Sequence, residues 1–270
     1  MIRFVKAHAC GNDFLIVEAK SVPEEDRREV AVHLCARNTG VGADGVEYLE
    51  WTGERSARIR LFNADGSIAE ISGNGTRCVA AWMARARIAT AGDVFAIETD
   101  AGTRECRLAD VDRSLFRIAA GMGVPKVSKS AVTLTNKAVI QGAVVSMGNP
   151  HFVIFTEAPD FSVADLKWES IGREICFHAD FPNQTNVEFV RVKSSHEIEI
   201  RIFERGVGPT TSSGTGTCAS AAASIALRGL EAELFVTAPG GSQLVTWPDA
   251  QSEMTLTGPA ELIATGEAFL

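Results

Sequence analysis

Two stretches of the chain are nearly the same: SGNGTRCVAAWMA at 72–84 and SGTGTCASAAASIA at 213–226. Each begins with a serine, continues with a Gly-x-Gly turn and runs into an apolar, alanine-rich segment. A glycine turn that opens a helix exposes backbone N–H groups at the positive end of the helix dipole, which favours an anion such as a carboxylate. A single short glycine motif often occurs by chance, but two copies indicate a shared plan.

The repeat extends beyond these turns. Gly11-Asn12 precedes the apolar run FLIV, and Gly148-Asn149 precedes HFVIF. A segment with helical periodicity lies between each Gly-Asn pair and its serine turn, at 23–37 and at 165–178. The sequence therefore predicts two halves of the same plan, related by duplication.

Alternating apolar and polar residues predict many short strands, for example at 59–64, 94–99, 186–192 and 197–203. The predicted fold class is α+β, with two similar domains that each wrap a β-barrel-like sheet around a central apolar helix. We expect an N-terminal half at 1–120, joined by a C-terminal strand at 260–270, and a C-terminal half at 121–259.

Composition excludes several classes of function. The 26 Lys and Arg against 34 Asp and Glu give a net charge of −8, and no stretch combines basic with aromatic residues, so no nucleic-acid partner is expected. The six cysteines stand singly, which predicts neither a metal site nor disulfides, as in a reduced cytoplasm. No signal peptide or membrane-length apolar stretch is found, so no membrane partner is expected.

Ser72 and Ser213 stand where a side chain reaches a ligand held by the start of the helix. Two halves that face one another offer two such sites across one cleft, which is the expected ligand site. Two reactive groups on opposite faces of a small molecule suit a reaction in which one removes a proton from carbon and the other returns it. The product has the mirror configuration at that carbon.

The chain resembles the cofactor-independent diaminopimelate epimerases over essentially its whole length. Besides the two serine turns, the resemblance rests on GNDF at 11–14, GVGADG at 40–45, FNADG at 62–66, GNPHFV at 148–153, TNVEFV at 185–190 and ERGVG at 204–208. It implies the diaminopimelate epimerase fold with pseudo-two-fold duplicated halves, a small-molecule amino-acid substrate closed between them, and neither a metal nor pyridoxal phosphate as cofactor.

The resemblance also assigns residues. It implies a polar clamp on the amino-acid groups of the substrate, made by Asn12, Asn63, Asn149, Asn186, Glu204 and Arg205. It implies helix-start donors for the α-carboxylate at Gly73, Asn74, Gly214 and Thr215. His151 is expected near Ser72 and Glu204 near Ser213, where each takes or orients a proton. An asparagine amide both donates and accepts, which suits a zwitterion.

The chain departs from the family at both catalytic positions, because Ser72 and Ser213 stand where the family has cysteine. A hydroxyl is a much weaker acid than a thiol and needs an adjacent base. Cys78 and Cys218 fall inside the helices and are expected to face the core as small hydrophobes. Three explanations are open: an engineered double substitution, a natural branch in which the serines work with His151 and Glu204, or a binding protein without catalysis. Pro209 also departs from the family and favours the natural branch.

The resulting interpretation is an isomerase that converts LL- to meso-diaminopimelate in the cytoplasm for lysine and cell-wall synthesis, with Ser72 and Ser213 as the two acid/base positions. The alternatives are a disabled amino-acid-binding homologue, and a racemase, epimerase or dehydratase of another amino acid on the same fold. Family members are often dimers, so a homodimer is expected by analogy.

Overall fold

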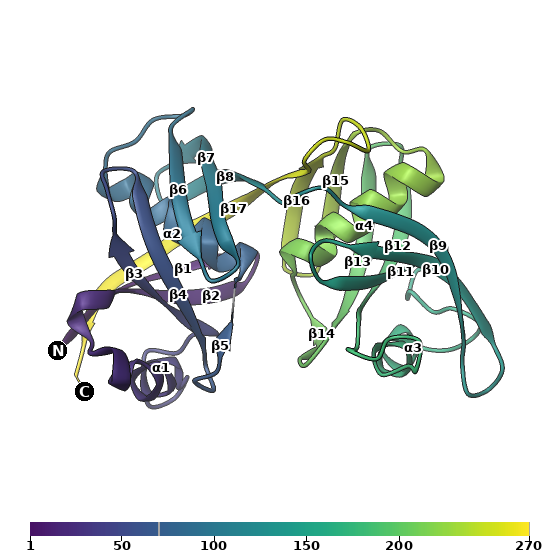
Figure 1. Ribbon diagram of the computed structural model, residues 1–270, viewed down its shortest axis with the longest axis horizontal. Coiled ribbons are helices and arrows are strands. Elements are labelled where there is room, and N and C mark those ends of the chain that lie inside the picture. Colours follow the sequence, from purple (N-terminus) through teal and green to yellow (C-terminus); the bar gives the residue numbers. More distant parts are fainter. Residues whose placement is uncertain (70, 270) are drawn as a thin grey trace. The chain divides into compact units, whose positions relative to one another are not determined.

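The computed structural model describes residues 1–69 and 71–269 (Figure 1). These residues divide into two compact units. Unit 1 comprises Met1–Ala120 with the C-terminal segment from Thr257, and unit 2 comprises Gly121–Leu256. Strands make up most of the regular structure in both units, which confirms the predicted α+β class. No helix in the described part of the chain is long and apolar enough to cross a membrane.

Unit 1 is a barrel closed around one helix. Its strands are β1 (Ile2–Ala9), β2 (Asn12–Glu18), β3 (Gly45–Trp51), β4 (Ser56–Asn63), β5 (Ile68–Ala69), β6 (Val94–Thr99), β7 (Gly102–Asp112), β8 (Leu115–Gly121) and β17 (Thr255–Ala268). Its helices are η1 (Ala19–Ser21), η2 (Glu24–Asp26), α1 (Arg27–Cys35) and α2 (Gly73–Ala86). Ladders join the strands in the order β1-β2-β3-β4-β6-β7-β8-β17, and β17 pairs back with β1.

The core of this barrel forms between α2 and the inward faces of the strands. Buried side chains from every barrel strand pack with the α2 segment 78–84. The alanines of α2 are good helix formers, and their small side chains let the surrounding strands approach closely. On the outer face of the sheet, α1 covers β2, β3 and β4 with a second cluster that includes Tyr48 and Phe62. Because both faces of β3 are covered, residues 45–49 are all buried.

Unit 2 repeats this plan. Its elements are β9 (Lys126–Thr133), β10 (Val139–Ser146), β11 (Pro150–Phe155), α3 (Trp168–Cys176), β12 (Asn186–Ser194), β13 (Glu197–Glu204), β14 (Gly208–Thr210), α4 (Gly214–Arg228), β15 (Glu233–Ala238) and β16 (Gly241–Thr246). Ladders join them in the order β9-β10-β11-β12-β13-β15-β16. One core cluster packs against α4 and a second against α3.

The two units match element by element. In each, a parallel ladder follows the Gly-Asn corner (β2 with β3, β11 with β12), and a second parallel ladder follows the buried helix (β4 with β6, β13 with β15). The helices α1 and α3 occupy equivalent places in this order, as do α2 and α4. The predicted duplicated fold is therefore confirmed.

Candidate active site

Both serine turns cap a helix. Ser72 precedes α2 and Ser213 precedes α4, each with extended backbone angles (φ −124° and ψ 120° for Ser72, φ −149° and ψ 125° for Ser213). Oγ of Ser72 accepts a hydrogen bond from the N–H of Gly75 at 3.1 Å, and Oγ of Ser213 accepts one from the N–H of Gly216 at 3.2 Å. This is the N-cap arrangement. Neither hydroxyl donates a hydrogen bond to another described residue, so each remains available to a ligand or a base.

The first helical residues follow these caps. Gly73 begins α2 and Gly214 begins α4, so their N–H groups lie among the unpaired donors at the positive ends of the two helices. Each unit thus presents one helix N-terminus with a serine at its edge.

In unit 1 a chain of hydrogen bonds crosses the first turn of α2. Nδ2 of Asn74 donates to Oδ1 of Asn12 at 3.2 Å, and Nδ2 of Asn12 donates to Oδ2 of Asp44 at 2.7 Å. Arg77 donates to Oδ1 of Asn74 at 2.5 Å. The structure therefore brings the predicted residues Asn12 and Asn74 together. Asp44 was not singled out from the sequence, although it lies inside the GVGADG motif.

The strand that carries Asn12 is held in place by charge. The buried Asp13 forms ion pairs with Lys6 at 3.1 Å and with Arg37 at 2.8 Å. Burial raises the pKa of Asp13, but hydrogen bonds from Arg37 and Lys6 outweigh it, so the pKa lies below its usual value. Asp13 stays ionised at neutral pH and fixes the start of β2.

Asn63 ends β4 and lies apart from this chain of hydrogen bonds. Its Nδ2 donates to Oγ of Ser67 at 2.9 Å, and its register partner on β3 is Gly45. The side chain is half-buried. A role for Asn63 in substrate binding stays a prediction.

In unit 2 the corresponding chain contains a histidine. Oε1 of Glu188 lies 2.7 Å from Nδ1 of His151, and Nε2 of His151 lies 3.0 Å from Oδ1 of Asn149. Nδ2 of Asn149 donates to Oγ1 of Thr215 at 3.3 Å, in the first turn of α4. His151 and Glu188 are both completely buried. The structure thus links three predicted residues to Glu188, which lies in the TNVEFV motif.

These contacts limit the His151–Glu188 pair to two protonation states. The amide oxygen of Asn149 only accepts, so Nε2 of His151 carries a hydrogen. A neutral His151 then accepts at Nδ1 from a protonated Glu188, whereas a charged His151 donates to an ionised Glu188. Either way the pair holds one mobile proton. Burial raises the pKa of Glu188, and the charge of His151 and its hydrogen bond oppose that effect.

The remaining predicted residues of unit 2 lie at the ends of β12 and β13. Oδ1 of the buried Asn186 accepts from the backbone N–H of Arg205 at 2.9 Å, and the exposed Arg205 side chain donates to the carbonyl of Asn183 at 3.0 Å. Burial raises the pKa of Glu204, and the nearby Glu188 carboxylate raises it further, while His151 lowers it. Glu204 therefore lies within electrostatic range of the His151–Glu188 pair. The expected position of His151 next to Ser72 stays a prediction, because the two residues belong to different units.

Matching strand registers relate the two sets of residues. Asn12 corresponds to Asn149, because each directly follows a glycine with positive φ at the corner that leads into its strand, β2 or β11. Glu47 on β3 corresponds to Glu188 on β12. Glu47 is completely buried, and burial raises its pKa to about 8. No pattern in the sequence marked Glu47.

The two helix cysteines face the cores, as predicted. Cys78 and Cys218 are completely buried within the clusters around α2 and α4. Burial also raises the pKa of Cys78 well above its ordinary value, which opposes thiolate formation. Both side chains therefore belong to the packing of the two cores.

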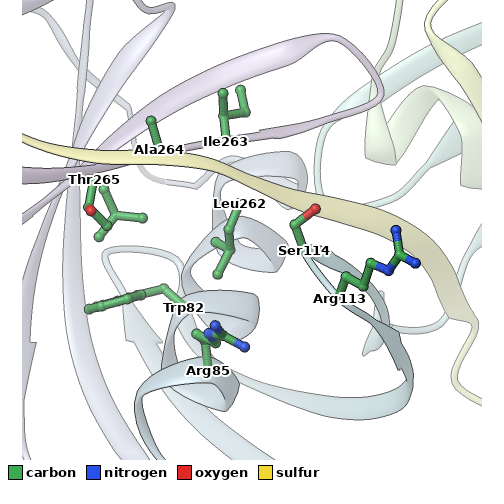
Figure 2. A pocket seen from close by; sticks show the side chains of 9 residues that line it. Trp82, Arg85, Arg113, Ser114, Leu262, Ile263, Ala264 and Thr265 are labelled. Atoms are coloured by element: carbon green, nitrogen blue, oxygen red, sulfur yellow. The ribbon is translucent and has the colours of Figure 1, made fainter.

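A sizeable pocket lies elsewhere in unit 1. It has a volume of about 520 Å³ and lies between the last turns of α2 and the strand β17, with Trp82 and Arg85 on one side and Leu262 on the other (Figure 2). None of the predicted site residues lines it. Among the described residues no cluster of His, Cys, Asp or Glu is placed to hold a metal ion.

Chemically, each unit combines the same four elements. These are donors for an anion at a helix N-terminus, a serine hydroxyl, an amide beside the first turn and a buried carboxyl beneath it. Such a set can bind a carboxylate and transfer a proton at an adjacent carbon.

Comparison with known proteins gives a consistent result. The sequence profile of the family described as diaminopimelate epimerase matches residues 4–127 and 143–263. The diaminopimelate epimerase of Desulforudis audaxviator is 38% identical over 282 residues, covering 98% of this chain and 99% of that protein. The diaminopimelate epimerase of Halothermothrix orenii is 36% identical, covering 100% of this chain and 98% of that protein.

A solved structure has a similar fold at low sequence identity. The hydroxyproline epimerase of Agrobacterium vitis, with bound trans-4-hydroxy-L-proline, aligns with a TM-score of 0.69 and 14% identity, covering 99% of this chain and 91% of that one. At this identity the likeness concerns the fold alone.

Proposed function

Because the chain belongs to the diaminopimelate epimerase family and is an amino-acid epimerase, we propose that it converts LL-2,6-diaminopimelate to meso-diaminopimelate. The reaction inverts the configuration of one α-carbon. One side chain of the protein removes the α-proton, and a second side chain delivers a proton to the opposite face. The observation that carries the proposal is the pair of serine-capped helix N-termini, one in each unit, at matched positions of a duplicated fold.

The helix N-termini explain how the reacting carbon is activated. In the proposal, the N–H groups at Gly73 and Asn74 and at Gly214 and Thr215 bind the α-carboxylate. The partial positive charge of the helix N-termini lies next to the bound carboxylate. It stabilises the negative charge that develops on the substrate when the α-proton leaves. Ser72 removes or returns the proton on one face, and Ser213 is the matching position for the other face.

The polar clamp holds the amino-acid groups. We assign this role to Asn12, Asn63, Asn149, Asn186, Glu204 and Arg205. The hydrogen bonds of Asn12 and Asn149 to the first turns of α2 and α4 support the assignment, because they fix the amides beside the bound carboxylate. Glu204 offers a carboxylate for a substrate ammonium group, and Arg205 offers a guanidinium for a substrate carboxylate.

His151 and Glu204 serve proton transfer in this proposal. Two observations support the role. Nδ1 of His151 lies 2.7 Å from Oε1 of Glu188, so the two groups can share a proton, and burial raises the pKa of Glu204 above its usual value. Since His151 is buried and bonded through both ring nitrogens, we assign it to holding and passing a proton inside unit 2.

A second function is favoured by one specific observation. Both catalytic positions carry hydroxyls that cap helices, and a hydroxyl abstracts an α-proton far less readily than a thiolate. A protein with this clamp and no rapid catalysis would be an amino-acid-binding homologue. A related epimerase, racemase or dehydratase for another amino acid would keep the same helix N-termini and differ in the clamp.

One experiment separates these functions. Exchange of the α-proton of LL-diaminopimelate is followed in D₂O by proton NMR for the serine protein and for a Ser72→Cys/Ser213→Cys variant. We expect exchange by both, at least about 10²-fold faster in the cysteine variant. Ser114→Cys/Ser194→Cys, with one change in each unit away from the helix N-termini, is the matched control and should exchange at the rate of the unchanged protein.

The outcomes differ for each function. Exchange by the cysteine variant alone would identify the serine protein as a binder or a disabled enzyme. Exchange by neither protein would reject diaminopimelate as the substrate. We further propose that the enzyme acts in the cytoplasm as a homodimer and supplies meso-diaminopimelate for lysine and cell-wall synthesis, which size-exclusion chromatography and complementation of an epimerase-deficient bacterium would test.

A further inference from the structure

Glu47 is a buried acid in the core of unit 1. It lies on β3 with Ile16 and Leu61 as its register partners on the neighbouring strands, and both of these are core residues of the barrel. The side chain is completely buried, and neither carboxyl oxygen has a hydrogen-bond partner among the described residues. Such a group costs free energy, so its presence calls for a function.

The carboxyl lies beneath the first turn of α2. A Cβ added to Gly75 would overlap Oε1 of Glu47, and the same point lies 3.3 Å from Cβ of Ser72. Glu47 and Ser72 therefore border one small space over the α-carbon of Gly75. Oε1 of Glu47 fills this place, and a glycine lets it approach the first turn of α2 so closely.

Unit 2 repeats the arrangement with a different support. A Cβ added to Gly216 would lie 2.8 Å from Oε1 of Glu188 and 3.3 Å from Oγ of Ser213. Here the carboxyl is held by His151, whereas the position equivalent to His151 in unit 1 is Phe14, which has no polar atom in its side chain. A buried glutamate, a glycine and a serine thus occur together in both units.

We propose that Glu47 acts as the base for Ser72 and Glu188 as the base for Ser213, each through the hydroxyl of its own unit. This inference rests on the proposed function and names the groups that receive and return the proton. Neither glutamate touches the substrate, so both are positioning residues for the serines. The pairing explains how hydroxyls can stand where the family has thiols, because a serine needs an adjacent base and a thiol does not.

The proton steps balance. The relay works in the molecules whose Glu47 is ionised, a fraction that grows as the pH rises toward about 8. The substrate C–H bond breaks as its proton goes to Oγ of Ser72, and the hydroxyl proton of Ser72 goes to Glu47. The electron pair stays on the α-carbon, delocalised into the substrate carboxylate. On the other face the proton of Glu188 goes to Oγ of Ser213, and the hydroxyl proton of Ser213 forms the new C–H bond. Glu47 ends protonated and Glu188 ionised, and proton exchange with solvent restores the starting state.

Substrate binding also explains how the hydroxyl is released. In the free protein Oγ of Ser72 satisfies the N–H of Gly75. A substrate carboxylate at the helix N-terminus is a stronger acceptor for that N–H. Ser72 is then free to turn its hydroxyl toward Glu47.

The test combines Glu47→Gln with Ser72→Cys. Exchange of the α-proton of LL-diaminopimelate is measured for the serine protein, Glu47→Gln, Ser72→Cys and the double variant. We expect Glu47→Gln to slow exchange about 10²-fold when residue 72 is serine and by less than about threefold when it is cysteine, because a thiol ionises without the base. Glu50→Gln, on the exposed end of the same strand, is the control and should leave exchange unchanged.

Each result decides the proposal. An equal loss in both backgrounds means that Glu47 only supports the fold, and no loss in either means that it does not serve Ser72; both results overturn the relay. If the serine protein does not exchange while Ser72→Cys/Ser213→Cys does, the relay is wrong, diaminopimelate stays the ligand, and the serine protein is a binder or a disabled enzyme. If neither exchanges, the proposed function fails and the relay fails with it.

Discussion

At the scale of single residues, Glu47 should govern part of the pH dependence of stability. Its pKa in the folded protein is about 8, above that of an exposed glutamate, so the folded state binds the proton more tightly than the unfolded state. At acid pH Glu47 is protonated in both states and does not lower the free energy of unfolding. As the pH rises toward about 8, the unfolded state ionises first, so the free energy of unfolding falls. The nearby thiol of Cys78 stays protonated over this range, since its own pKa is raised by burial.

Glu47→Gln removes this titration. We expect the free energy of unfolding of the unchanged protein to fall, relative to the variant, by up to about 1.4 kcal/mol per pH unit between about pH 5 and about pH 8. Urea unfolding of both proteins across that range measures the difference. Parallel stability curves would show that Glu47 is ionised, or solvated, in the folded state.

Arg205 tests the substrate clamp separately from catalysis. We expect Arg205→Ala to weaken diaminopimelate binding by roughly 1–3 kcal/mol, because a charged hydrogen bond to the substrate is lost. Isothermal titration calorimetry gives the affinity, and Arg173→Ala, an exposed arginine on α3 of the same unit, is the control. Unchanged affinity would remove Arg205 from the site.

The motifs in the sequence predicted most residues of the two hydrogen-bond chains. The sequence did not predict Glu47, for a physical reason. A glutamate in a strand is expected to face solvent, but α1 covers one face of β3 and α2 the other, so alternation along the strand carries no information at 45–49. The burial of Glu47 follows from the packing of α1 and α2 on the two faces of β3, which the sequence pattern does not contain.

At the scale of elements, periodicity placed the strands closely. The segment 94–99 was predicted as a strand and is β6, and 197–203 lies within β13. The predicted helix at 23–37 is shorter in the structure, where α1 covers Arg27–Cys35 after a 3-10 turn. Pro23 and three consecutive acids shape this entry, which the apolar spacing alone did not reveal.

At Gly75, where α2 contacts β3, we expect alanine to be less stable than glycine, the opposite of the usual order in helices. Alanine is normally about 1 kcal/mol more favourable than glycine inside a helix. At Gly75 the added methyl would overlap the Glu47 carboxyl, so we expect Gly75→Ala to lower the free energy of unfolding, by about 1–3 kcal/mol. Denaturant unfolding measures the change.

A second substitution checks the cause. Glu47→Ala removes the carboxyl that the methyl meets, so the cost of Gly75→Ala should largely disappear in that background, as a coupled pair requires. An undiminished cost would mean that the first turn of α2 needs glycine for another reason.

At the scale of the whole molecule, the C-terminal strand belongs to the unit that begins the chain. The domain bounds predicted from the sequence, 1–120 with 260–270 and 121–259, stay a prediction that the folding of separate fragments would test. The ladder of β17 with β1 runs from Ile2 paired with Ala268 to His8 paired with Glu261. Without β17 the edges of β1 and β8 lose this partner, and the barrel of unit 1 stays open.

Three fragments test this view. We expect residues 121–256 to fold alone with one cooperative urea transition, because their two core clusters are formed within that segment. Residues 1–120 alone should lack such a transition. Joining 257–269 through a short turn to the N-terminus of 1–120 should restore it, since Ala268 is the register partner of Ile2 in the ladder of β17 with β1. Cooperative unfolding of 1–120 alone would show that the other seven strands and α2 suffice, and that β17 serves a purpose other than closing the barrel.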